Sequence, residues 1–349
     1  MDRRTYLLRS GAACLATLAG FRPARAADYT LRLGSITVES SPNYRQVQQL
    51  ARGMEQASAG VLEIADKPAG GYGRPAALYD MVESGDLDMA YTVQGYSPGR
   101  FPQTSVMELP LLFNNAVEGT SALRSLYEQG MLSRDYNSVK VLALTALSPY
   151  GLFTSGKTMT HLRELRGLRV RAASLTLGLM LSRLGMIPLG VPLDLMSEML
   201  ADHTLDAVTY GWDSMGATQG TGPNALAEQV KVLIDAQFPA PTLMLIMNRQ
   251  KWGMLSPELQ AVLEQQGQVF ATTAAEGLVR RDAEARARFK ADPRYSYVEL
   301  TDATRGEMTQ ALQPMITAWK ESMTKQGYDG ETLYDAAVAA AQASKPAAG

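Results

Sequence analysis

The chain has 349 residues, with 33 Lys or Arg against 35 Asp or Glu and a formal net charge of −2. This length exceeds one usual hydrophobic core, so we expect two lobes. No basic tract is long enough to indicate nucleic acid or anionic lipid as a partner. The single cysteine, Cys14, excludes a disulfide within the chain.

The N-terminus has the layout of an export signal. Arg3 and Arg4 precede a modestly apolar stretch, too short to span a bilayer, and Ala24-Arg25-Ala26 offers a cleavage site. The segment Arg3-Arg4-Thr5-Tyr6-Leu7 resembles a twin-arginine signal, and this favours twin-arginine over Sec export. Asp2 departs from that signal, because Ser or Thr is usual at its position. Removing residues 1–26 leaves 28 basic residues (33 minus five) and 34 acidic ones (35 minus one). Cys14 leaves with them, so we expect no thiol nucleophile in the exported chain.

Strands and helices alternate along most of the chain. Apolar alternation and short apolar runs predict strands at Leu31–Thr37, Val61–Lys67, Leu87–Val93, Lys140–Leu147, Leu168–Ala172, Leu205–Tyr210 and Thr242–Asn248. Amphipathic stretches between them predict helices at Tyr44–Ala57, Ala116–Arg134 and Leu175–Leu184. The pattern is typical of an α/β fold with βαβ units.

The C-terminal part reads as helical. After Pro257, and to about Lys290, the chain carries alanines, glutamines and paired charges, which suit a long exposed helix. A further helix is predicted from Thr301-Asp302 to Gly327. The alanine-rich tail from Ala336 should be frayed at its end.

The segment Leu165–Arg171 turns through Gly167 and enters a short strand. Strand alternation places Arg169 and Arg171 on one face, away from the apolar residues between them. At least one of these arginines needs an anionic partner. Because guanidinium is a permanently charged planar fork, an arginine at a strand end can receive a carboxylate through two parallel hydrogen bonds. A solvated surface arginine or a structural ion pair is the alternative.

Seven short motifs follow one another in a fixed order around this segment. They are Gly70-Gly71-Tyr72-Gly73, Gly85-Asp86-Leu87-Asp88-Met89, Leu109-Pro110-Leu111-Leu112-Phe113, Leu165–Arg171, Leu184–Leu189 with Glu198-Met199-Leu200, Thr204–Val208 with Trp212-Asp213, and Asn248–Trp252 with Leu255-Ser256-Pro257-Glu258. Each motif alone is weak. In this order they resemble the DctP-type solute-binding proteins of TRAP transporters, over nearly all of the exported chain.

The resemblance implies a two-lobed periplasmic solute-binding fold with hinge-crossing strands and a long C-terminal spine helix. The implied divisions are an export signal at 1–26, lobe I at 27–148 with a strand region at about 238–255, lobe II at 149–237, and spine and C-terminal helices at 256–349. The implied function is capture of a small organic acid by cleft closure and its delivery to one small and one large membrane subunit. Neither a cofactor nor catalysis is implied.

The ligand is expected at the carboxyl ends of the strands, where the cleft opens. The resemblance implies that Arg171 holds the ligand's carboxylate. Other candidates follow strand ends or lie at the crossover between lobes; they are Gln94, Tyr96, Tyr150, Thr209, Tyr210, Trp212 and Phe238. Core packing remains an alternative for Tyr210 and Trp212, and a satisfied loop residue for Gln94 and Tyr96.

Two departures from the family pattern narrow the ligand. Relatives that take dicarboxylates or sialic acid commonly carry a second arginine before a Thr-Ser-Asn-Lys-like strand, and the segment 151–155 has none. Many members have Asp-Gly-x-Glu where this chain has Asp206-Ala207-Val208-Thr209, which removes a carboxylate. With Trp212 and tyrosines nearby, the sequence favours a monocarboxylate with an apolar or aromatic body.

Catalytic interpretations have little support. His161 and His203 sit in polar surroundings without partners at metal-ligand spacing. No Gly-x-Ser-x-Gly elbow is present, and the Gly70–Gly73 run lacks the ending of a phosphate loop. A secreted hydrolase that uses a Glu/Asp pair, and a binding component of an ABC transporter, remain alternatives.

Overall fold

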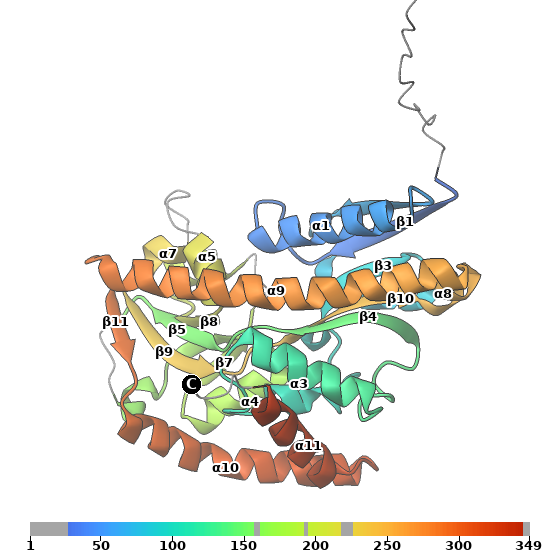
Figure 1. The fold of residues 1–349 in the computed structure, drawn as a ribbon. Helices are drawn as coiled ribbons and strands as arrows, with labels where there is room; N and C mark the ends of the chain where they lie inside the picture. The colour runs from blue at the N-terminus through green and yellow to red at the C-terminus, as the bar shows by residue number, and fades with distance from the viewer. Residues whose placement is uncertain (1–26, 157–160, 192–194, 218–225, 345–349) are drawn as a thin grey trace, which may run out of the picture.

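The computed structural model describes residues 27–156, 161–191, 195–217 and 226–344. Its strands form two sheets flanked by helices, so the predicted two-lobed α/β architecture is confirmed (Figure 1). We call the five-stranded sheet with its helices the first lobe, and the six-stranded sheet with its helices the second lobe. The predicted export segment and the end of the tail lie outside the described residues.

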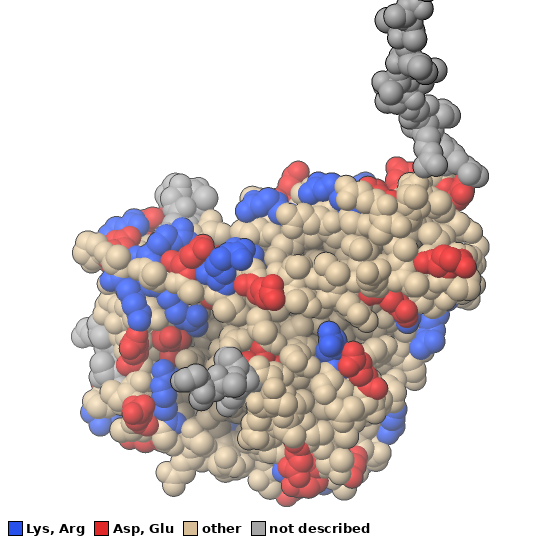
Figure 2. Space-filling model, viewed as in Figure 1, with Lys and Arg blue, Asp and Glu red and all other residues tan. Residues whose placement is uncertain are grey.

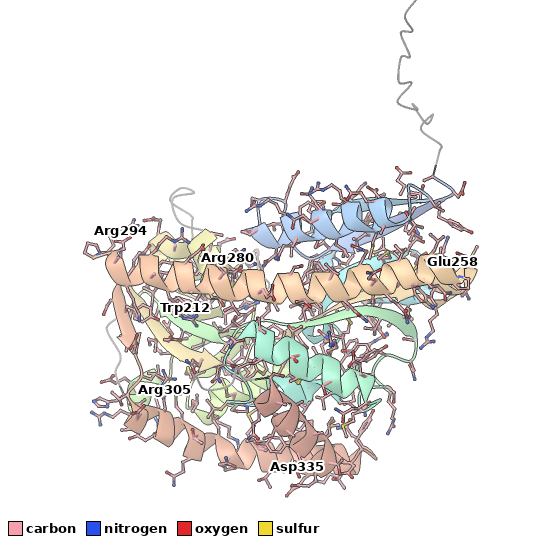
Figure 3. The ribbon with its side chains drawn as sticks, viewed as in Figure 1. Trp212, Glu258, Arg280, Arg294, Arg305 and Asp335 are labelled. Carbon is pink, nitrogen blue, oxygen red and sulfur yellow. The ribbon has the colours of Figure 1, made fainter. Side chains whose placement is uncertain are left out.

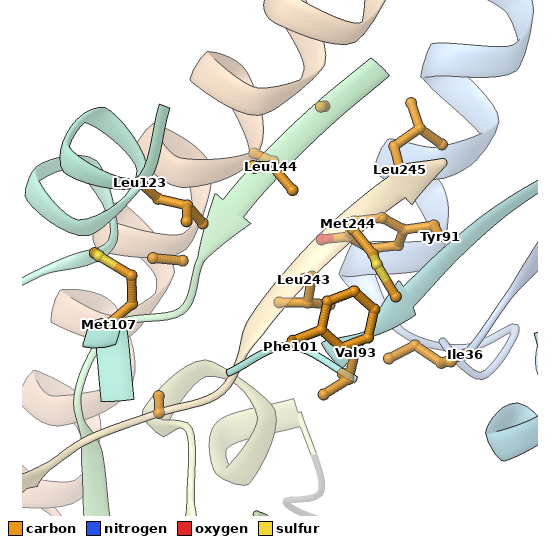
Figure 4. Close-up of a cluster of buried hydrophobic side chains, with 14 of the residues drawn as sticks. Ile36, Tyr91, Val93, Phe101, Met107, Leu123, Leu144, Leu243, Met244 and Leu245 are labelled. Atoms are coloured by element: carbon orange, nitrogen blue, oxygen red, sulfur yellow. The ribbon is translucent and has the colours of Figure 1, made fainter. Parts of the chain in front are cut away.

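The first sheet has the order β2-β1-β3-β10-β4. β1 is parallel to β2 and β3, whereas β10 is antiparallel to both of its neighbours. The strands are β1 (Tyr29–Ser35), β2 (Leu62–Lys67), β3 (Met89–Val93), β4 (Val139–Ala146) and β10 (Thr242–Asn248). Every residue of β3 and β10 is buried, as expected for central strands covered on both faces. Figure 4 shows the apolar side chains of these strands packed together.

The second sheet has the order β11-β9-β5-β8-β6-β7. β5 is antiparallel to β8 and β9, whereas β6 is parallel to β7 and β8. The strands are β5 (Tyr150–Thr154), β6 (Arg169–Ala172), β7 (Ile187–Gly190), β8 (Ala207–Tyr210), β9 (Val232–Phe238) and β11 (Ser296–Glu299). Of these, β5, β7, β9 and β11 are additional to the strands that the sequence pattern predicts.

The remaining elements are helices packed on the two sheets. They are α1 (Pro42–Ala57), α2 (Leu78–Ser84), α3 (Ala116–Glu128), α4 (Leu175–Arg183), α5 (Met196–Ala201), α6 (Trp212–Ala217), α7 (Leu226–Gln229), α8 (Arg249–Met254), α9 (Pro257–Ala291), α10 (Asp302–Lys325) and α11 (Gly330–Ala343), with short 3-10 helices η1 (Pro75–Ala77), η2 (Gln94–Tyr96), η3 (Thr104–Glu108) and η4 (Leu162–Leu165). α3 ends six residues before the predicted Arg134, because Gly130 adopts a left-handed φ of 76° and stops the helix.

The chain crosses between the sheets more than once. It leaves β4 for β5 through residues 147–149 and returns from β9 to β10 through residues 239–241. It then follows α9 back to β11 in the second sheet. Each lobe is therefore built from separate stretches of sequence, and short crossing segments join the two.

α9 is the predicted long helix and runs along both lobes (Figure 1). It begins after Ser256, whose hydroxyl accepts a hydrogen bond from Leu259 N, and Pro257 occupies the first turn. The helix contacts α1, α3 and β4 in the first lobe and α6 and β11 in the second. At Gly267 it comes so close to β4 that a Cβ atom there would lie 2.3 Å from the carbonyl oxygen of Leu142.

Charged side chains of both signs mix on the face shown in Figure 2. Beyond the C-terminal end of α9, Arg294 forms ion pairs with Glu228 at 3.2 Å and with Asp292 at 2.8 Å. Exposed pairs of this kind contribute little to stability.

Candidate functional site

The two neighbouring arginines of β6 have different partners. Gly167 adopts a φ of 79°, which turns the chain into β6 as predicted. Arg169 is half-exposed and forms a two-pronged ion pair with Asp206, with Nε–Oδ2 at 2.9 Å and Nη2–Oδ1 at 2.8 Å. The Arg169 guanidinium lowers the pKa of Asp206. Arg169 therefore forms a structural ion pair, which the sequence analysis gave as the alternative to a carboxylate receptor.

Arg171 is buried, with 3% of its surface exposed. Its Nε donates to Val191 O at 3.2 Å and its Nη1 to Thr209 O at 3.2 Å, so two backbone carbonyls hold the guanidinium. Among the described residues, no carboxylate oxygen lies within 4.0 Å of it. A buried charge without a counter-ion is costly. This arginine has the surroundings of an anion receptor.

Two tyrosines from neighbouring strands lie close to Arg171. The rings of Tyr150 and Tyr210 are 6.3 Å apart, centre to centre. Burial raises the pKa of both hydroxyls, and the positive charge of Arg171 opposes that rise in each. Tyr96 from the first lobe acts electrostatically on both as well. The structure thus brings together Arg171, Tyr150, Tyr210 and Tyr96, three of them from the second lobe and one from the first.

Thr209 lies at the same place, but its side chain is fully buried. Its hydroxyl donates to the backbone oxygen of Arg171 at 2.7 Å and thereby ties β8 to β6. Its carbonyl holds the guanidinium, as described above. Thr209 therefore positions Arg171, and its own hydroxyl is already engaged within the sheet.

The structure places the other three sequence-predicted residues in the cores. Trp212 is fully buried beneath the C-terminal half of α9 (Figure 3), with its ring centre 4.9 Å from Phe153 and 5.4 Å from Tyr297. Phe238 is the last residue of β9 and pairs with Tyr150 in the sheet. Gln94 donates from Nε2 to the hydroxyl of Tyr136, inside the first lobe, at 3.0 Å. Trp212 has the core-packing role that the sequence left open.

The two lobes touch next to the arginine strand. A Cβ atom placed at Gly95 would lie 3.4 Å from the Cβ of Ser174, so η2 packs against the start of α4. Ser174 caps α4, with its hydroxyl accepting from Leu177 N at 3.2 Å, and donates to Oε2 of Glu108 in the first lobe at 2.5 Å. The sequence did not predict a role for Glu108, because no local sequence pattern identifies a glutamate that contacts the other lobe.

Glu108→Gln should isolate the pH dependence that this buried carboxyl causes. Burial raises the pKa of Glu108 to about 7, from 4.5, and the Ser174 hydroxyl offsets only part of the rise. Between these values the folded chain binds more protons than the unfolded chain, so stability falls as pH rises through the window. The total loss is about 3 kcal/mol.

The glutamine variant lacks this titration. Its unfolding free energy relative to the parent should therefore increase by about 3 kcal/mol between about pH 4 and about pH 8, measured by urea denaturation. Burial also raises the pKa of Asp135 and Asp282 to about 6, but both proteins share these groups and their effect cancels. A difference that stays constant with pH would contradict the burial of this carboxyl.

Together, the fold and this site have the features of an extracellular solute-binding protein: two α/β lobes, crossing segments between them, and a buried arginine without a carboxylate partner among the described residues. The family model of the bacterial extracellular solute-binding proteins, family 7 (DctP), matches residues 33–325. The chain belongs to this family, the periplasmic solute-binding proteins of TRAP transporters. Its members are transporter binding proteins and not enzymes.

Individual relatives are distant in sequence. The 2,3-diketo-L-gulonate-binding periplasmic protein of Escherichia coli K12 is 21% identical over 251 residues, 71% of this chain and 75% of that protein. Among solved structures, a marine metagenome TRAP solute-binding protein specific for aromatic acids, in complex with 3-hydroxybenzoate, is 24% identical, with a TM-score of 0.83 and coverage of 92% of this chain and 100% of that one. A Rhodoferax ferrireducens TRAP protein with copurified benzoate is 24% identical, with a TM-score of 0.83 over 90% and 98% of the chains. These likenesses show the shared fold.

No helix in the described ranges is both long enough and apolar enough to cross a bilayer.

Proposed function

We propose that the protein captures an organic acid between its lobes and delivers it to the small and large membrane subunits of a TRAP transporter. The observation that carries this proposal is the buried guanidinium of Arg171, which has no carboxylate partner among the described residues. A ligand carboxylate would supply the missing charge through the planar fork that arginine offers.

The ligand class that fits best is a monocarboxylate with an apolar or aromatic body. Tyr150 and Tyr210 provide aromatic surface beside the receptor. The β5 segment carries no second arginine, and a Cβ atom at Gly151 would already lie 2.7 Å from the ring of Phe153, so position 151 has no room for one. Burying a second carboxylate without a partner would cost several kcal/mol, by a rough estimate. The structural relatives described with 3-hydroxybenzoate and benzoate support this class.

Capture would proceed by closure of the cleft. Tyr96 and Glu108 belong to the first lobe, whereas Arg171 and Ser174 belong to the second. A ligand can therefore contact residues of both lobes only when the lobes meet. A ligand shifts the balance between open and closed forms only by its preference for one of them. Moving from 1:99 to 99:1 takes about 5.5 kcal/mol of preference. One charge-assisted pair together with buried apolar area can supply this.

A melting-temperature screen with organic acids tests the proposal. Monocarboxylates such as benzoate and mandelate should raise the melting temperature without forming product, because a ligand at a hundred times its Kd stabilises the folded state by about 2.7 kcal/mol. A secreted hydrolase would instead form product. Succinate or malate raising the melting temperature more than their monoacid analogues would contradict the ligand class.

The transporter type has its own test. Neighbouring genes for one small and one large membrane subunit, without an ATPase, would exclude an ABC transporter as the partner.

A further inference from the structure

Asp213 is a buried carboxylate next to the proposed pocket. It follows Gly211 at the start of α6, three residues after Tyr210, and is 7% exposed. Its Oδ1 accepts a hydrogen bond from the Ser214 hydroxyl at 2.9 Å, and its Oδ2 receives Nε of Arg281 at 3.4 Å. A carboxylate has room for about four hydrogen bonds, so it can accept more.

The position of Asp213 puts it beside the same tyrosines as Arg171. A Cβ atom built on Gly211 would lie 3.3 Å from Oδ1 of Asp213 and 3.6 Å from Cε1 of Tyr150, so both atoms flank that glycine. The negative charge of Asp213 acts on Tyr150 and Tyr210 in opposition to the positive charge of Arg171. The tyrosine pair therefore has a cation and an anion for neighbours.

Arg281 comes from α9 and is already engaged. Besides its contact with Asp213, its Nη2 donates to Oδ1 of Asn43 at the start of α1 at 2.7 Å. Its side chain is only 18% exposed. Asp213 neutralises this second guanidinium, so the region offers a ligand a hydrogen-bond acceptor rather than a second anion receptor.

We propose that Asp213 is a specificity-determining residue that accepts a hydrogen bond from a hydroxyl on the ligand's body and rejects a second carboxylate. The inference rests on the proposed function, since it requires the ligand's carboxylate to lie at Arg171. It narrows the ligand class to hydroxylated monocarboxylates. A second carboxylate at this position would meet the charge of Asp213, and like charges in a buried site repel strongly.

Three aromatic acids test the assignment, measured by isothermal titration calorimetry. Benzoate has no second group, 3-hydroxybenzoate carries a hydroxyl, and isophthalate carries a carboxylate at the same ring position. The parent should bind 3-hydroxybenzoate about tenfold more tightly than benzoate, since a hydrogen bond to a charged acceptor is worth roughly that factor. It should bind isophthalate far more weakly than either of the other two acids. This comparison needs no variant.

Asp213→Asn keeps the size of the side chain and removes its charge. The advantage of 3-hydroxybenzoate over benzoate should shrink severalfold, and isophthalate binding should improve at least about tenfold because Arg281 loses its neutralising partner. The double variant Asp213→Asn/Arg281→Met should lose this gain, which a merely structural role of Asp213 would not predict. Asp80→Asn is the matched control, because Asp80 is an exposed residue paired with Arg100.

The outcomes separate this inference from the proposed function. Binding ratios that Asp213→Asn leaves unchanged would overturn the role of Asp213 alone. Isophthalate binding to the parent as tightly as 3-hydroxybenzoate would overturn both that role and the monocarboxylate class, but not the proposed capture of an organic acid. If neither benzoate nor 3-hydroxybenzoate bound the parent, the proposed ligand class would fall, and this assignment with it.

Discussion

Replacing Arg171 with methionine should weaken solute binding by about 2–5 kcal/mol, which is a loss of roughly 30-fold to several-thousand-fold in affinity. The reason is that the side chain is buried and held by two backbone carbonyls, so its charge is fixed where a ligand carboxylate would lie. Lysine should restore only part of the affinity, because an ammonium group cannot bind a carboxylate with two parallel hydrogen bonds. Isothermal titration with the best acid from the melting screen measures both variants.

Arg169→Met is the matched control. Arg169 lies two residues away on the same strand, but it is half-exposed and paired with Asp206. Its loss should leave the affinity close to that of the parent. Equal losses in the two variants would mean that the strand, and not the guanidinium of Arg171, carries the effect.

Gly267→Ala should destabilise the protein by at least about 1–3 kcal/mol, although alanine is normally the better helix former by about 1 kcal/mol. The new Cβ atom would lie 2.3 Å from the carbonyl oxygen of Leu142 and 2.9 Å from its carbonyl carbon. Both atoms are backbone in the first sheet, so no flexible side chain can move aside. α9 would have to shift away from β4, with loss of packing along the helix. Urea or thermal denaturation would show the change.

Gly306→Ala is the opposite case of the same substitution. Gly306 is exposed in α10, and nothing lies within 4 Å of a Cβ atom built there. This change should stabilise the protein by about 0.5–1 kcal/mol, because only the conformational entropy of glycine is removed. If both variants shifted stability in the same direction, the close approach of α9 to β4 would not be the cause.

Local sequence patterns predicted the elements that have a clear period or cap. The strand at Thr242–Asn248 agrees with the prediction to the residue, and α9 begins within one residue of its predicted start. β5 and β9 escaped the pattern for a physical reason. β5 is only five residues long and contains Gly151, which weakens the strand pattern, and β9 interrupts its apolar run with Asp235 and Gln237.

The sequence could predict a residue of the candidate site only where the chemistry of its side chain requires a particular kind of partner. The charge of arginine marked Arg169 and Arg171 alike as residues that need an anion or water, and only the resemblance to the family pointed to Arg171. Whether Arg169 or Arg171 keeps a protein partner depends on Asp206, which lies just before β8 and 37 residues away in sequence. The same holds for Trp212, because an aromatic residue after a strand suits a pocket wall and a core equally well until its neighbours Phe153 and Phe289 are known. Tertiary contacts, not local pattern, decide these cases.

β10 lies between β3 and β4, although every strand of the second sheet except β11 precedes it in sequence. During synthesis, β3 and β4 therefore leave the ribosome long before the strand that joins them, and each keeps an unpaired edge until residue 248 has emerged. α9, one of the helices that pack on β4, emerges later still. The first half of the chain thus cannot complete its own sheet, and the growing polypeptide has a long interval in which a chaperone can hold it unfolded.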